Sequence, residues 1–113
     1  MVRFIKTAVK AASDKFGEDI VILNIGGVSS LADYFLIVTG GNVNQIKAIA
    51  DEIDRKLRDE GVYPKHTEGY DSASWVLLDY GFMIIHIFDR ESRNFYSIER
   101  LWSDARTVDA TTL

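Results

Sequence analysis

The sequence predicts a single α/β domain built on a mixed five-stranded β-sheet flanked by helices. The chain has 113 residues, the usual size of one domain. Segments with apolar residues at helical spacing alternate with short β-branched runs, and no repeat, low-complexity tract or linker interrupts them. The expected order is helix, strand, strand, helix, strand, strand, strand. A helical crossover then returns the chain in parallel, and the later hairpin is antiparallel, so the sheet is mixed.

The first half of the chain predicts two helices and two strands. Residues 2–16 carry an apolar stripe at helical spacing, and a glycine follows it. Residues 19–25 and 34–39 are apolar on both faces and each precedes a glycine pair, as expected of strands covered on both sides. Asn42 and Gln45 resemble a capping box at the start of the second helix. Its apolar stripe consists of Val43, Ile46, Ile49, Ala50, Ile53 and Leu57.

The next segment predicts an edge strand followed by a hairpin. Residues 62–67 are strand-like but contain Pro64, which has no backbone N–H to donate and therefore indicates an edge strand. Residues 74–80 and 82–88 are two apolar runs separated only by Gly81, which is typical of a tight antiparallel hairpin.

The periodic pattern ends at the last part of the chain. Ser97 is expected to cap a short closing helix over residues 98–102. The sequence that follows is polar. We therefore assign residues 1–105 to the domain and expect residues 106–113 to form a polar, flexible tail.

Composition narrows the class of protein. With 47% hydrophobic and 27% charged residues the chain has an ordinary globular composition. It has no cysteine, so disulfides and thiolate chemistry are excluded. The N-terminus lacks the pattern of a signal peptide and the apolar runs are too short for a membrane span, so we expect a cytoplasmic protein with no membrane partner. A net charge of −4 disfavours direct nucleic-acid binding and favours a basic protein partner.

Few residues offer catalytic chemistry. His66 and His86 are the only histidines, and His86 lies in an apolar run where a core histidine is the usual interpretation. Asp89 and Glu91 could hold Mg²⁺ at a strand end, but we favour their interpretation as loop charges with Arg90 and Arg93 as salt-bridge partners. The turn at residues 39–42 could cradle an anion but matches no phosphate-binding motif. We therefore expect no enzyme and no cofactor, and keep a small nucleotide-binding or nucleotidyltransferase-like enzyme as the alternative.

Aromatic residues suggest a surface for docking. Trp and Tyr are the usual anchors of protein interfaces, although they also fill cores. Strand alternation places Trp75, Leu77 and Asp79 on one face, and Tyr80 with its alternate neighbours on the other. Both faces carry apolar bulk, so a helix or a partner must cover at least one of them. For Trp75 itself, core and interface remain equally open.

Three segments in order carry a family resemblance. They are residues 29–35 (SSLADYF), 75–81 (WVLLDYG) and 93–102 (RNFYSIERLW). Together with Thr39-Gly40, Glu68-Gly69 and His86, they make residues 3–105 resemble the ribosomal silencing factor family, RsfS, also called the Iojap family. The resemblance implies a nucleotidyltransferase-like topology and a factor without enzymatic activity. Such a factor binds the large ribosomal subunit through ribosomal protein uL14, blocks joining of the small subunit and represses translation under nutrient limitation.

The resemblance also implies which residues meet the partner. The partner-facing aromatic of the hairpin falls on Trp75, and the tyrosine before the final helix falls on Tyr96. Leu77, Asp79 and Tyr80 are neighbours expected to join them. The chain departs from many relatives at Phe82, where they carry an acidic residue after the hairpin glycine. The same surface could also pair two copies of the free protein as a homodimer.

Overall fold

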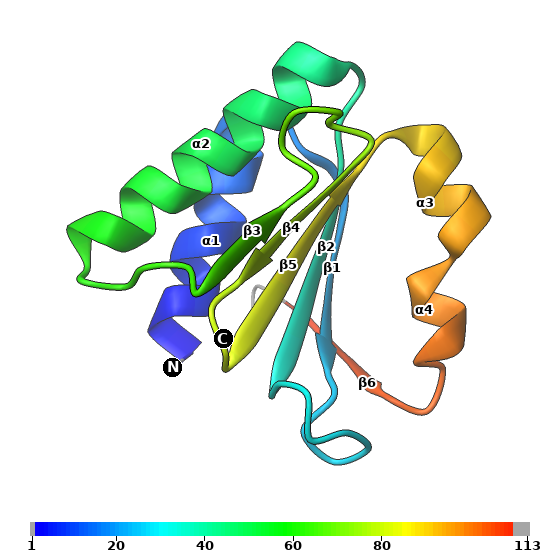
Figure 1. Ribbon diagram of the computed structural model, residues 1–113. Helices are drawn as coiled ribbons and strands as arrows, with labels where there is room; N and C mark the ends of the chain where they lie inside the picture. Colours follow the sequence, from blue (N-terminus) through cyan, green and yellow to red (C-terminus); the bar gives the residue numbers. More distant parts are fainter. Residues whose placement is uncertain (1, 110–113) are drawn as a thin grey trace.

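The computed structural model describes residues 2–109, which form four helices and one six-stranded sheet in a single domain (Figure 1). The first half comprises α1 (Val2–Asp14), β1 (Glu18–Asn24), β2 (Tyr34–Thr39) and α2 (Val43–Asp59). The second half comprises β3 (His66–Glu68), β4 (Trp75–Asp79), β5 (Met83–Phe88), α3 (Arg90–Tyr96), α4 (Ile98–Leu101) and β6 (Arg106–Val108). Helices α1 and α2 lie on one side of the sheet, and α3 and α4 lie on the other (Figure 1).

The sheet is mixed, with strand order β3-β4-β5-β2-β1-β6. The central pair β2 and β5 is parallel, and every other neighbouring pair is antiparallel. The α2 crossover carries the chain over the sheet to the β4–β5 hairpin, whose two strands are antiparallel to each other and whose β5 lies parallel to β2. The predicted mixed topology is thus confirmed. The predicted edge position is also confirmed, but the strand is shorter than residues 62–67, since Pro64 lies before it and only His66–Glu68 forms β3 at one border.

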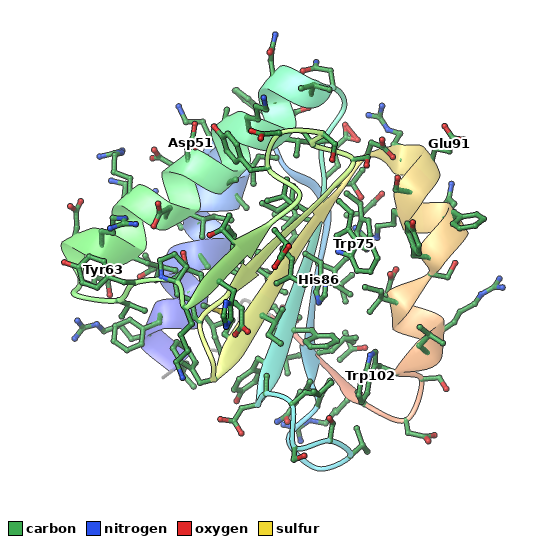
Figure 2. All side chains as sticks on the ribbon, in the orientation of Figure 1. Asp51, Tyr63, Trp75, His86, Glu91 and Trp102 are labelled. Atoms are coloured by element: carbon green, nitrogen blue, oxygen red, sulfur yellow. The ribbon has the colours of Figure 1, made fainter. Side chains whose placement is uncertain are left out.

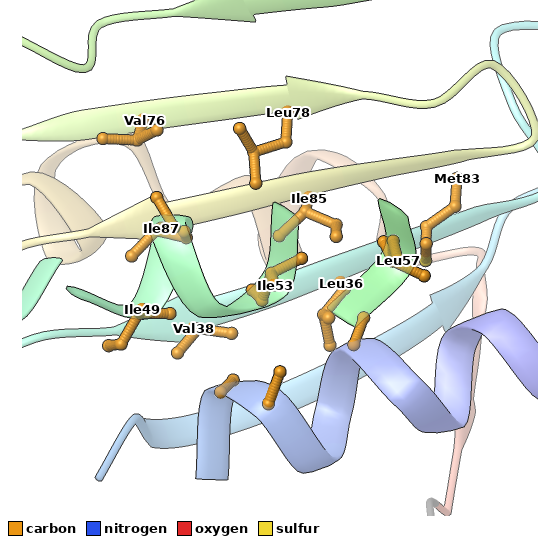
Figure 3. Close-up of a cluster of buried hydrophobic side chains, with 14 of the residues drawn as sticks. Leu36, Val38, Ile49, Ile53, Leu57, Val76, Leu78, Met83, Ile85 and Ile87 are labelled. Atoms are coloured by element: carbon orange, nitrogen blue, oxygen red, sulfur yellow. The ribbon is translucent and has the colours of Figure 1, made fainter. Parts of the chain in front are cut away.

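The main core lies between the sheet and the α1–α2 layer (Figure 3). The apolar stripe of α2 buries Ile46, Ile49, Ile53 and Leu57 completely against the sheet. Each fully buried aliphatic side chain contributes about 1.5–3 kcal/mol relative to an exposed one. The sheet residues that meet this layer are Leu36, Val38, Val76, Leu78, Met83, Ile85 and Ile87.

The start of α2 is fixed by the residues that the sequence singled out. Asn42 Oδ1 accepts a hydrogen bond from the backbone N–H of Gln45 at 2.8 Å. Gln45 Oε1 accepts one from the N–H of Gly41 at 2.6 Å, one residue before the position of a standard capping box. Gln45 Nε2 also donates to the carbonyl of Phe16 at 2.9 Å. One glutamine therefore ties the start of α2 to the end of α1.

A smaller core lies on the opposite face, beneath α3 and α4. Its buried residues are Leu23, Ile25, Ala32, Phe35, Ile37, Phe88 and Ile98. Trp102 packs edge-on against Phe35, with ring centroids 5.4 Å apart. Side chains on both faces of the central strands are therefore covered, as their two-sided apolar pattern indicated.

The strand count and the tail are corrected by the structure. We expected five strands and a flexible tail from residue 106, but Arg106–Val108 forms β6, antiparallel to β1. Only one of its three residues is apolar, and so short a strand has no alternation to recognise. Val108 packs against the main core. The predicted flexibility of residues 110–113 lies outside the described residues.

Helix α3 was also missed by the sequence patterns. It has seven residues and buries only Arg93, so it has no apolar stripe. Ser97 does not cap α4 with its side chain. It adopts a left-handed conformation with φ 44°, and its hydroxyl donates to the carbonyl of Asn94 at 2.6 Å. The serine thus shapes the junction between the two short helices, hereafter the α3–α4 arm.

Phe82 has a packing role at the hairpin tip. Its ring lies 5.9 Å from that of Phe4 on α1 and packs against the main core. An acidic residue could not make this contact without losing hydration. Among residues 2–109, no helix is long and apolar enough to cross a membrane.

Candidate protein-docking surface

Trp75 and Tyr96 come together where the sheet meets the α3–α4 arm. Trp75 begins β4 and Tyr96 ends α3, and their ring centroids are 4.6 Å apart with planes inclined at 45°. Figure 2 shows Trp75 between the sheet and α3. The Trp75 side chain is half-buried, whereas Tyr96 is 44% exposed. Trp75 is therefore partly in the core and partly at the surface.

Strand alternation places Leu77 and Asp79 on the same face as Trp75, as predicted, and both are half-buried. The edge strand adds to this face, because Glu68 pairs with Leu77 and His66 pairs with Asp79. We call the set Trp75, Leu77, Asp79 and Tyr96 the Trp75 surface. It combines aromatic and aliphatic groups with a carboxylate at its margin.

Tyr80 does not belong to the Trp75 surface. It lies on the other face, is 4% exposed and packs in the main core against the α1–α2 layer. Burial raises the pKa of its phenol well above the ordinary value, with the Asp54 carboxylate adding to the effect. Contrary to its predicted role as a contact residue, it is not placed to meet a partner on that surface, because the alternation that leaves Leu77 and Asp79 half-buried at the surface turns the Tyr80 side chain inward.

Beneath Trp75 lies a histidine surrounded by aromatic rings. The indole Nε1–H donates to His86 Nδ1 at 3.1 Å. His86 is 4% exposed. Its ring centroid lies 4.7 Å from that of Phe35, in an edge-on arrangement, and 6.1 Å from that of Phe88, in a stacked arrangement. Burial lowers the pKa of His86 to about 4, because a charged imidazole would lose its hydration here. The interpretation of His86 as a core histidine is confirmed.

Arg93 anchors the arm that carries Tyr96. Its guanidinium is nearly buried and donates from Nη1 to the carbonyl of Asp19 at 2.6 Å and to Thr39 Oγ1 at 2.9 Å. Nη2 pairs with the Glu99 carboxylate at 3.2 Å. One side chain therefore links β1, β2 and α4 to α3. Sequence reasoning missed this role because Asp19 and Thr39 are distant in the chain and the acceptor of Asp19 is a main-chain carbonyl.

The residues considered for catalysis have structural partners. Asp89 caps α3, accepting from the N–H of Ser92 at 2.7 Å, while Glu91 is exposed in the first turn. Arg90 pairs with Glu18 rather than with either carboxylate considered for Mg²⁺. The salt-bridge partner of Arg93 is Glu99. The expected pairing of these arginines with Asp89 and Glu91 is therefore wrong. No group of three His, Cys, Asp or Glu residues within 2–109 is placed to hold a metal ion.

The turn at residues 39–42 uses its amides internally. The N–H of Gly40 donates to the carbonyl of Phe88 at 2.8 Å, and the N–H of Gly41 is held by Gln45. The hollow beside this turn, lined partly by Thr39 and Arg93, has a volume of about 120 Å³. Ligand pockets usually measure about 300–1,000 Å³, so this hollow is small for a nucleotide.

The sequence is similar to known proteins along nearly its whole length. Residues 2–113 match the family model described as ribosomal silencing factor during starvation. A ribosomal silencing factor RsfS of Bacillus subtilis is 43% identical over 105 residues, covering 93% of this chain and 89% of the relative. The RsfS of Halalkalibacterium halodurans is 42% identical, covering 93% and 90%. The chloroplastic protein Iojap of Zea mays is 32% identical, covering 94% of this chain and 46% of that protein.

Solved structures show the same fold. A crystal structure of a Chromobacterium violaceum protein superposes with a TM-score of 0.87 at 35% identity, covering 89% of this chain and 84% of the other. A Bacillus halodurans protein gives a TM-score of 0.84 at 38% identity, covering 95% and 97%. Fold and surface together define a small mixed α/β domain with an aromatic cluster at the junction of sheet and helical arm. The chain belongs to the ribosomal silencing factor family, and the resemblance in its sequence is confirmed.

Proposed function

We propose that this protein represses translation by docking on the large ribosomal subunit. The Trp75 surface binds ribosomal protein uL14, and the bound domain obstructs joining of the small subunit when nutrients are limiting. It acts in the cytoplasm as a steric block, without catalysis and without a cofactor.

The observation that carries the proposal is the contact between Trp75 and Tyr96 at the protein surface. Binding energy in protein interfaces concentrates in a few Trp, Tyr and Arg side chains near the centre of a patch. Here two such aromatic residues meet, one half-buried for rigidity and one exposed for contact. Family membership supports the choice of a ribosomal partner.

Charge supports a protein partner of basic character. The net charge is −4, and Asp79 lies on the Trp75 surface, with Glu68 on the neighbouring edge strand. Complementary charge accelerates encounter with a basic protein and acts against unassisted contact with the ribosomal RNA backbone. A patch of about 800 Å² per partner would be of standard size for a specific complex.

The first test is whether the protein holds the subunits apart. Purified protein is added in excess to isolated subunits at fixed Mg²⁺ and the mixture is resolved on a sucrose gradient. We expect co-sedimentation with large subunits and a smaller fraction of joined ribosomes. An unchanged gradient profile contradicts the proposal. Calorimetry with isolated uL14 then separates two causes: absence of binding refutes uL14 as the partner, whereas binding without an effect on joining refutes the steric block.

The same preparation tests the alternative of a nucleotide-handling enzyme. A ligand present at a hundred times its dissociation constant stabilises a protein by about 2.7 kcal/mol. We expect no thermal shift with ATP or CTP and Mg²⁺, because the amides of Gly40 and Gly41 and the carboxylate of Asp89 already have partners. A shift of several degrees in the melting temperature would favour the enzyme.

Light scattering of the free protein measures whether two copies associate through the Trp75 surface.

A further inference from the structure

The Trp75 indole is oriented by a hydrogen bond rather than by packing alone. Trp75 pairs directly with Phe88, and His86 pairs with Leu77, so His86 is the diagonal neighbour of Trp75 across the β4–β5 ladder. Such a neighbour is within reach of a large aromatic side chain that leans along the strand. The indole Nε1–H reaches His86 Nδ1 at 3.1 Å, and Figure 2 shows both side chains on the same face of the sheet.

We infer that His86 is a positioning residue of the Trp75 surface, and that its Nδ1 holds the indole in the orientation that the ribosomal partner meets. The inference rests on the proposed function, because the partner is the one proposed above. It assigns affinity to a residue that is 4% exposed and cannot itself touch the partner.

The hydrogen bond requires one particular state of the imidazole. Nδ1 accepts, so the proton of neutral His86 lies on Nε2, whereas a charged imidazole would donate from both nitrogens and lose the bond. Burial keeps the ring neutral, since it lowers the pKa to about 4. The acceptor is therefore present throughout the physiological pH range.

Burying an imidazole at this position lowers the stability of the fold. Nε2 is buried without a hydrogen-bond partner in the described part of the chain, and an unsatisfied buried donor costs about 1–3 kcal/mol. The neighbours Ile85 and Ile87 are aliphatic and pack without such a penalty. The hydrogen bond to Trp75 is the contact that an aliphatic residue could not replace.

The other ring neighbours of Trp75 do not form hydrogen bonds with its Nε1–H. Its ring centroid lies 5.0 Å from that of Phe88 and 4.6 Å from that of Tyr96, and both pairs of rings are tilted relative to each other. A half-turn about the Cβ–Cγ bond would return the indole to the same plane with Nε1 on the other side, and ring contacts distinguish these two orientations less than one directed hydrogen bond does. Ordering a flexible side chain during binding costs about 0.5–1.5 kcal/mol, so an indole that is already fixed binds more tightly.

The geometry also says which part of the indole the partner meets. Nε1–H is directed inward to His86 and is occupied. The partner therefore contacts the carbon edge and face of the ring, beside the exposed Tyr96. This favours an aliphatic chain or the stem of a basic residue over a hydrogen-bond acceptor as the group docked on Trp75.

The test compares variants that move or remove the acceptor. His86→Asn keeps an amide oxygen near the position of Nδ1, His86→Gln moves the amide toward the position of Nε2, and His86→Leu removes it. Ile85→Val, buried on the opposite face of β5, is the stability control, expected to cost about 0.5–1.5 kcal/mol without touching Trp75. Affinity for purified uL14 is measured by calorimetry.

We expect His86→Leu and His86→Gln to weaken binding by about fivefold to tenfold, an effect within the cost of ordering one flexible side chain on binding, and His86→Asn by less than about threefold. Ile85→Val should bind as the wild type does. In a Trp75→Phe background, where the donor is absent, His86→Leu should change affinity by less than about twofold. If His86→Leu does not fold, the comparison of Asn with Gln decides the question.

Two results would overturn the inference. One is wild-type affinity in folded His86→Leu, and the other is an equal loss in the wild-type and Trp75→Phe backgrounds, which would mark His86 as merely structural. The heteronuclear NMR signal of the Trp75 indole N–H, assigned with Trp102→Phe, should move in His86→Leu whether or not a partner is present. Failure of wild-type protein to bind uL14 refutes the proposed function, whereas an unmoved indole signal refutes the hydrogen bond itself.

Discussion

The rings of Trp75 and Tyr96 lie 4.6 Å apart although one belongs to the sheet and the other to the helical arm. Aromatic pairs of this kind contribute about 0.5–1.5 kcal/mol beyond the area they bury. The pair therefore connects the position of the arm to the position of the hairpin. A substitution that moves either the arm or the hairpin should therefore also displace side chains of the Trp75 surface.

Removing either ring should weaken ribosome binding. We expect Trp75→Ala and Tyr96→Ala each to lose about 2 kcal/mol or more of binding free energy, the effect of truncating an aromatic anchor. Circular dichroism checks the fold, and co-sedimentation with large subunits measures binding. Tyr63→Ala is the matched control, because Tyr63 is also exposed but stacks on Arg58 beside α2 (Figure 2). Normal binding by both folded variants would place the docking face elsewhere.

Acid should destabilise the protein through His86. Its folded pKa is lowered to about 4, below the unfolded value of about 6.5, so the unfolded chain binds the extra proton first. The stability is fully present above about pH 6.5 and falls as the pH drops toward 4, by about 3 kcal/mol in total. Urea denaturation at several pH values measures the loss. His86→Gln should lack this component, so equal acid sensitivity in wild type and variant would contradict the assignment.

Gly69 is expected to be intolerant of a side chain. A Cβ there would lie 2.1 Å from the backbone carbonyl oxygen of Trp75, and φ is +75°, a conformation that L side chains rarely adopt. We expect Gly69→Ala to cost about 1–3 kcal/mol of stability and to displace Trp75. Gly27→Ala is the control, because its Cβ would meet nothing within 4 Å. Chemical denaturation compares the two, and equal midpoints would contradict the close approach.

Arg93 should be more important for stability than its exposed neighbour. Arg93→Met removes donors to the Asp19 carbonyl, Thr39 and Glu99, and breaking such a buried network costs about 3 kcal/mol. Because the arm loses its anchor, binding through Tyr96 should also weaken. Arg90→Ala removes only an exposed pair with Glu18 and should leave the denaturation midpoint nearly unchanged. Similar midpoints for both variants would argue against the anchoring role.

The carboxylates after β5 should matter for stability and not for activity. Replacing Asp89 and Glu91 together with Ala removes the cap of α3, which costs about 1 kcal/mol. The inhibition of subunit joining should stay within about twofold once the folded fraction is corrected for. Sucrose gradients measure it. A tenfold loss of inhibition in folded protein would make these carboxylates functional.

Much of this protein is determined by local sequence. Hydrophobic periodicity identified α1, α2 and the hairpin, and Pro64 identified the edge strand, because each signal depends on neighbours in the chain. The capping residues of α2 were readable for the same reason. Strand alternation correctly placed Trp75, Leu77 and Asp79 on one face.

Contacts between distant segments were decided by tertiary structure alone. β6 exists because β1 offers it a free edge, and α3 is held by Arg93 acting on a carbonyl and a hydroxyl from two strands. Sequence placed Tyr80 among the contact residues through its neighbours in the motif, whereas packing against α1 and α2 buries it. The bond from Trp75 to His86 likewise depends on the diagonal register of β4 and β5. Periodicity reports which side of an element is apolar, but only the packed chain decides which side chains meet across it.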